Sequence, residues 1–119
     1  MTKIQNSKRY DLEERSLKFA KEIIVFVKGL PKSMANAEIA KQLIRSSSSI
    51  GANYIEANES LSKKDFTMRI KICRKEAKES RYWLKLLVIR PESEKERDTL
   101  IQEVSELMKI FGSILEKSK

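Results

Sequence analysis

Residues 62–90 read SKKDFTMRIKICRKEAKESRYWLKLLVIR, and this stretch decides the fold class. Its apolar and small residues recur at alternating steps of four and three, at Phe66, Ile70, Cys73, Ala77, Ser80, Leu84 and Leu87. Such spacing places one stripe of side chains along a single face of an α-helix, whereas a half-buried strand alternates at every second residue. The stretch therefore predicts one long amphipathic helix over residues 63–89.

The segments on either side repeat this spacing. In the preceding segment the stripe consists of Ile39, Leu43, Ser46 or Ser47, Ile50, Tyr54, Ala57 and Leu61. In the following segment it consists of Leu100, Val104, Leu107, Phe111 and Ile114. No segment alternates as a strand does, so the pattern predicts an all-α fold.

Helix boundaries follow from capping residues and helix breakers. Three pairs match a capping box, in which an N-cap oxygen and a carboxylate three residues later satisfy backbone N–H groups: Asp11 with Glu14, Ser62 with Asp65, and Ser93 with Glu96. Residues 29–33 contain Gly and Pro, and Pro91 ends the helix before it. We expect helices near residues 11–29, 34–60, 63–89 and 94–117, with residues 1–9 flexible.

The connections between these helices are short. Leu61 and Phe66 stand where a hydrophobic staple would flank the second capping box, which predicts a tight turn there. Short connections make neighbouring helices antiparallel, and 119 residues fit one domain. The chain therefore predicts a single antiparallel up-down-up-down four-helix bundle over residues 1–119.

Two stretches are apolar nearly all round the helix, residues 23–27 and residues 82–89. The first and third helices run in the same direction in this topology, so both stretches fall at one end of the bundle. Either they form a thickly packed end of the core, or they form a belt that a second subunit covers. The second alternative predicts self-association.

The composition argues against several kinds of chemistry. The chain has no histidine and one cysteine, Cys73, so a disulfide framework, a His base and a Glu-x-x-His metal centre are all excluded. Cys73 stands in the apolar stripe, where a free thiol acts as a small hydrophobe. We expect no enzymatic activity, no catalytic residue, no metal and no cofactor.

The N-terminal residues and the apolar runs bear on cellular location. The first ten residues are polar and lack the apolar core of a signal peptide. The longest unbroken apolar run covers only residues 23–27, too short to span a bilayer. These features predict a cytoplasmic protein that does not insert into a membrane.

The formal net charge is +8, and most of the excess lies in one segment. Residues 62–90 hold ten basic and three acidic residues. Seven of these cations gather beside the apolar stripe at helical spacing: Lys64, Lys71, Arg74, Lys75, Lys78, Arg81 and Lys85. Such a row can bind nucleic-acid phosphates with little sequence preference. The alternative is an ordinary solvated basic face.

A second polar row, Arg45, Ser49, Asn53 and Glu56, lies along the second predicted helix. In a hairpin that turns near Ser62, opposed positions have numbers that add to about 124. This register predicts ion pairs between Arg45 and Glu79 and between Glu56 and Arg69. Structural pairing is the interpretation that we favour over a catalytic role.

Several segments are shared with a known family. They are residues 10–15 (YDLEER), 19–21 (FAK), 30–31 (LP), 41–57 (KQLIRSSSSIGANYIEA), 63–66 (KKDF) and 77–84 (AKESRYWL). These segments resemble the four-helix bundle family typified by proteins encoded in intervening sequences of bacterial 23S rRNA genes. Residues 91–119 carry little of the distinctive motif.

This resemblance implies an up-down bundle, a ring-shaped homo-oligomer with a pentamer favoured, and no known enzymatic activity. A ribosomal label for such proteins reflects gene location. A more distant relative is the accessory protein of diversity-generating retroelements, a basic pentamer that engages nucleic acid and a reverse transcriptase. The leading hypothesis is a homo-oligomer that binds RNA or DNA; the alternative is a scaffold for an unidentified protein partner.

Overall fold

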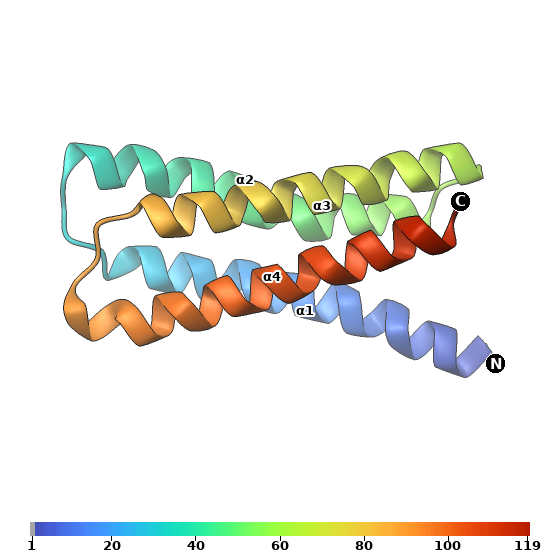
Figure 1. Ribbon diagram of the computed structural model, residues 1–119, viewed down its shortest axis with the longest axis horizontal. Helices are drawn as coiled ribbons and strands as arrows, with labels where there is room; N and C mark the ends of the chain where they lie inside the picture. The colour runs from blue at the N-terminus through green and yellow to red at the C-terminus, as the bar shows by residue number, and fades with distance from the viewer. Residues whose placement is uncertain (1) are drawn as a thin grey trace.

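The computed structural model describes residues 2–119, with side chains described from Leu12 onward. Over residues 2–119 the chain forms four α-helices, α1 (Thr2–Lys28), α2 (Met34–Asn58), α3 (Lys63–Leu86) and α4 (Glu94–Lys117), with a short 3-10 helix η1 (Pro91–Ser93) before α4. Figure 1 shows the helices side by side, with the connections α1–α2 and α3–α4 at one end and the turn α2–α3 at the other. The predicted antiparallel four-helix bundle is confirmed.

Two helix boundaries differ from the predicted ones by three residues or more, the start of α1 and the end of α3. Helix α1 continues through Asp11 to Thr2, and residues 2–10 contain no Gly or Pro that would interrupt it. The helix start predicted at Asp11 is therefore wrong. The prediction that residues 1–9 are flexible falls on residues whose side chains lie outside the described ones. Helix α3 stops at Leu86, since Leu87 is already extended.

Of the other two predicted capping boxes, one caps its helix and one does not. Ser62 caps α3 as predicted, since its Oγ accepts a hydrogen bond from the Asp65 N–H at 3.1 Å. Ser93 precedes α4 but makes no side-chain capping bond, because the 3-10 turn places its backbone in a helical conformation. Leu61 is fully exposed, so the predicted staple with Phe66 does not form.

The core contains most of the predicted stripes of α2, α3 and α4, together with Leu12, Phe19, Ile23 and Phe26 of α1. In α3 the stripe residues from Ile70 to Leu87 are buried, and in α4 those from Leu100 to Phe111 are buried. Both Ser46 and Ser47 of α2 are buried, and Ser46 Oγ lies 2.7 Å from Ser80 Oγ across the α2–α3 interface. Gly51 allows α2 to approach α1, because a Cβ at this position would lie 3.2 Å from Ser16 Cβ.

Packing follows chain order around the bundle, and the pair α1–α4 packs much less closely than the other adjacent pairs. Arg15 of α1 bridges this pair by donating to Glu103 at 2.8 and 3.0 Å and to Glu106 at 3.2 Å. None of the helices over residues 2–119 is long and apolar enough to cross a membrane.

The two apolar stretches do lie at the same end of the bundle. The buried Asn36 side chain donates to the Val88 carbonyl at 2.9 Å and accepts from the Val88 N–H at 3.1 Å. Arg90 donates to the Gly29 carbonyl at 2.8 Å. Phe26 and Leu84 belong to the core, whereas Val25, Tyr82 and Val88 are more than half exposed. The stretches thus serve the core and still leave apolar surface uncovered.

Candidate nucleic-acid interface

Five of the seven predicted cations line one hollow between α3 and α4, of about 630 Å³. We call it the basic hollow, and its lining residues are Lys71, Arg74, Lys75, Lys78, Arg81, Met108 and Leu115. At a helical rise of about 1.5 Å per residue, the cations extend over roughly 15 Å of α3. The structure therefore brings most of the predicted site together in a single concave surface.

The remaining two cations lie outside the hollow. Lys64 is exposed in the first turn of α3, and Lys85 is exposed in its last turn. Both belong to the same helix as the five lining cations, so they extend the basic row beyond the two ends of the hollow.

Helix α4 supplies the opposite wall. Met108 and Leu115 are half-buried apolar residues seven positions apart, and Arg81 Nη1 donates to Ser105 Oγ at 3.3 Å. A Cβ at Gly112 would lie 3.9 Å from the Arg74 guanidinium carbon, so this glycine leaves room beside Arg74. Sequence reasoning missed these α4 residues, although apolar residues beside the core stripe were a usable signal.

The charges in the basic hollow are not balanced. Its lining includes no carboxylate, and none of the five cations forms an ion pair with any described side chain. Like charges gathered without counter-charges create a positive potential that attracts polyanions. The electrostatics of the basic hollow are therefore those of a surface suited to anionic groups such as phosphates.

The opposite flank of α3 faces α2 and is bonded within the chain. Arg69 Nη1 donates to Asn53 Oδ1 at 3.0 Å, and Cys73 Sγ donates to the Ile50 carbonyl at 3.4 Å. These contacts match the predicted register. The two predicted ion pairs, Glu56 with Arg69 and Arg45 with Glu79, are wrong, since neither is present among the described side chains. The Arg69 guanidinium bonds Asn53 in place of Glu56.

Two groups of this region have altered acidity. Burial raises the pKa of the Cys73 thiol to about 12, which fits the predicted role of Cys73 as a small core residue and leaves it an unreactive thiol. Burial, followed by the neighbouring Glu79 carboxylate, raises the pKa of Glu76, while Arg45 opposes the shift. Glu76 Oε1 is buried without a hydrogen-bond partner.

Comparison with known proteins places these features in a family. The sequence profile of the 23S rRNA-intervening sequence proteins matches residues 8–113. A crystal structure from Bacteroides thetaiotaomicron VPI-5482, of a protein with unknown function from the S23 ribosomal protein family, superposes with a TM-score of 0.76. The two sequences are 32% identical, over 92% of this chain and 98% of the other. No curated protein matches this chain.

The matched region includes all of α2 and α3 and nearly all of α4, so it contains every residue of the basic hollow except Leu115. The chain belongs to the 23S rRNA-intervening sequence protein family.

Proposed function

We propose that this protein is a non-enzymatic, homo-oligomeric bundle of the cytoplasm that binds RNA or DNA through the basic hollow and the adjoining Lys64 and Lys85. One observation carries the proposal: five cations share a concave surface whose lining contains no carboxylate. Holding like charges together costs free energy, and a bound polyanion would offset that cost.

The lining residues indicate how binding would work. Lys and Arg contacts to phosphates release condensed counterions, which gives affinity with little dependence on base sequence. The hollow contains no aromatic side chain on which bases could stack. Binding should therefore be dominated by the nucleic-acid backbone and should discriminate weakly among sequences.

Self-association would strengthen such binding. Several copies of the basic hollow in one particle raise the effective concentration of sites along a long polyanion. Light scattering measures the number of copies, and the resemblance to ring-forming relatives favours a pentamer.

The direct test is a charge reversal on the basic hollow, with Lys71, Lys75 and Lys78 all changed to Glu. The matched control changes Lys28, Lys32 and Lys117 to Glu, and these three exposed residues lie outside the hollow. Both variants therefore alter the net charge equally. Fluorescence anisotropy with labelled duplex RNA and duplex DNA at low salt should show binding reduced at least a hundredfold by the first variant. The control variant should lose much less affinity for both nucleic acids.

The second candidate function is a protein-interaction scaffold, which a separate apolar groove between α1 and α4 favours. The basic hollow is a solvated face if the wild-type protein binds neither nucleic acid at low salt, or if the hollow variant binds them as tightly as the wild type. The scaffold function then becomes the leading one. Circular dichroism and light scattering on each variant exclude loss of the fold or of assembly as the cause.

A further inference from the structure

An exposed aromatic side chain, Tyr82, stands on α3 just beyond the basic hollow. Lys71, Lys75 and Lys78 precede it by eleven, seven and four positions, a spacing that places side chains on one face of a helix. Lys85 follows Tyr82 by one turn, so the tyrosine lies between two exposed cations of the basic row. The row of cations therefore continues past the hollow with an aromatic ring in its path.

The Tyr82 side chain is 58% exposed, and its ring contacts that of Trp83. The two ring centroids lie 5.1 Å apart with an interplanar angle of 72°, an edge-to-face contact. Trp83 packs half-buried against the core, so this contact restrains the Tyr82 ring. Only one ring of an edge-to-face pair presents its face to the other, so the contact leaves at least one face of Tyr82 uncovered.

The charges around Tyr82 favour an anionic ligand. Residues 78–86, within about one helical turn of it, include three cations, Lys78, Arg81 and Lys85, and one carboxylate, Glu79. Glu79 is half-buried and lies on the side of Tyr82 that turns toward α2, away from the basic hollow. A polyanion that follows the cations of α3 therefore meets the tyrosine ring before it meets a carboxylate.

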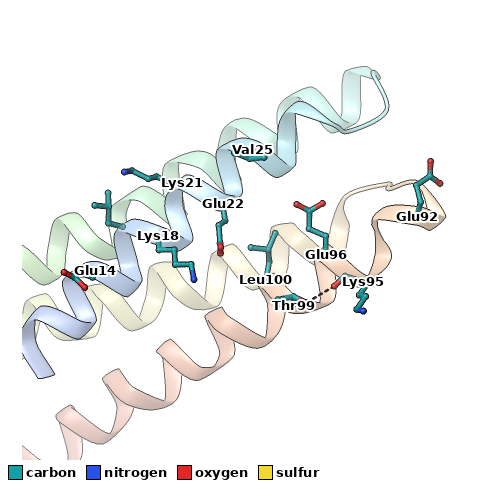
Figure 2. A pocket seen from close by; sticks show the side chains of 11 residues that line it. Glu14, Lys18, Lys21, Glu22, Val25, Glu92, Lys95, Glu96, Thr99 and Leu100 are labelled. Atoms are coloured by element: carbon teal, nitrogen blue, oxygen red, sulfur yellow. Dashed lines mark hydrogen bonds between the residues drawn. The ribbon is translucent and has the colours of Figure 1, made fainter. Parts of the chain in front are cut away.

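The groove between α1 and α4, of about 810 Å³, offers no comparable path. Figure 2 shows side chains of both charges in it. Its lining contains four carboxylates, Glu14, Glu22, Glu92 and Glu96, among three lysines. A surface of mixed charge attracts a polyanion weakly. The basic hollow and Tyr82 are therefore the surface on which a nucleic-acid strand is expected.

We propose that Tyr82 stacks on an unpaired base of a strand whose phosphates lie in the basic hollow, so that single-stranded nucleic acid is the preferred ligand. The inference rests on the proposed nucleic-acid binding and adds its substrate class. Lys78 and Tyr82 lie about 6 Å apart along α3, so neighbouring nucleotides of one strand reach both. In a duplex the base faces are covered by adjacent base pairs, whereas unpaired bases leave them open to an aromatic ring.

The first test compares Tyr82→Ala with Tyr82→Phe, which keeps a ring, and with Leu86→Ala. Leu86 is the matched control because it is 45% exposed and lies one turn further along α3. Fluorescence anisotropy should show that Tyr82→Ala binds a labelled single-stranded oligonucleotide about tenfold more weakly than wild type, and a blunt duplex less than twofold more weakly. Tyr82→Phe and Leu86→Ala should bind both ligands as the wild type does.

The salt dependence distinguishes stacking from a phosphate contact. Stacking releases no counterions, so the loss in Tyr82→Ala should be the same factor at each salt concentration, with an unchanged salt slope. A slope that falls in Tyr82→Ala would contradict stacking, because it would mean that the change disturbs the phosphate contacts.

An oligonucleotide with stable abasic sites decides whether the bases are bound, because it keeps the phosphates and lacks the bases. The wild type should bind it about tenfold more weakly than the intact strand, and Tyr82→Ala should cause no further loss. Equal binding of the intact and abasic strands, or an equal loss in Leu86→Ala, overturns stacking and leaves backbone binding in place. A wild-type protein that binds neither strand nor duplex overturns both proposals. Circular dichroism on each variant excludes loss of the fold as the cause.

Discussion

The two flanks of α3 use their charges differently. On the flank facing α2, Arg69 bonds Asn53, and the Arg45 cation acts on the Glu76 carboxylate. On the flank facing α4, five cations line the basic hollow and no carboxylate joins them. The same helix thus presents one flank whose polar groups bond within the fold and another whose cations form no ion pair with a described side chain.

This difference separates stability from binding. Polar groups at a helix interface mainly stabilise the fold, because removing one partner leaves the other poorly solvated. Exposed cations without partners contribute little to stability. Changes on the α2 flank should therefore alter the free energy of unfolding and leave nucleic-acid binding intact. Changes on the α4 flank should weaken nucleic-acid binding and leave the free energy of unfolding nearly unchanged.

The largest stability effect is expected for Arg69→Ala on the α2 flank. The half-buried guanidinium donates to Asn53, and a hydrogen bond to a charged group contributes about 1.5–3 kcal/mol. Urea unfolding should show a loss of about 2 kcal/mol, with affinity for duplex RNA unchanged within twofold. Equal losses of stability and affinity would show that the two flanks are not independent.

Arg74→Ala is the matching change on the α4 flank. Removing one phosphate contact should weaken binding by about fivefold to tenfold near 0.1 M salt and reduce the salt slope by about 0.9. Urea unfolding should differ from wild type by less than about 0.5 kcal/mol. A stability loss comparable with that of Arg69→Ala would assign Arg74 a structural role.

A smaller effect is expected for Ser80→Ala at the centre of the α2–α3 interface. Ser46 Oγ loses its 2.7 Å contact with Ser80 but keeps its bond to the Leu43 carbonyl at 3.3 Å, so no buried hydroxyl is left without a partner. The free energy of unfolding should fall by about 0.5–1 kcal/mol. Changing Ser46 to Ala in the same chain should add almost nothing, which a double-mutant cycle measures.

The smallest effect depends on pH and concerns Glu76. Burial and the Glu79 carboxylate raise the pKa of Glu76 in the folded state, so the folded protein binds more protons than the unfolded chain just above the ordinary glutamate pKa. This contribution to stability is present at low pH and is lost as pH rises through the raised pKa. Glu76→Gln should be more stable than wild type at pH 7 but not at about pH 4, as measured by thermal unfolding. A variant equally stable or less stable at pH 7 would contradict the assigned cause.

Periodic packing explains what the sequence could predict. The stripes of α3 and α4 and the register of the α2–α3 hairpin follow from local spacing and one capped turn at Ser62, and each is found in the structure. The cations of the basic hollow could also be named, because five of them lie at helical spacing on one segment. Local patterns were sufficient wherever the relevant residues share one helix or one tight turn.

Contacts between distant segments could not be predicted in this way. Met108 and Leu115 approach α3 only because α4 returns along it, and the groove between α1 and α4 lies where these two helices pack loosely. The ion pair expected between Glu56 and Arg69 was wrong, because the Arg69 guanidinium donates to Asn53 instead. Helical register gives the neighbourhood of a side chain, but competition among neighbours decides its partner.

The central claim is that the cations of the basic hollow bind phosphates, and a salt titration of the wild-type protein on duplex RNA tests it most directly. The logarithm of the association constant should fall against the logarithm of salt concentration between about 50 and 200 mM. The slope should be about −4.5 if the five hollow cations alone contact phosphates and about −6.3 if Lys64 and Lys85 also do. A slope in this range that is lost when Lys71, Lys75 and Lys78 become Glu supports the account. Absence of binding, or binding whose affinity does not change with salt, contradicts it.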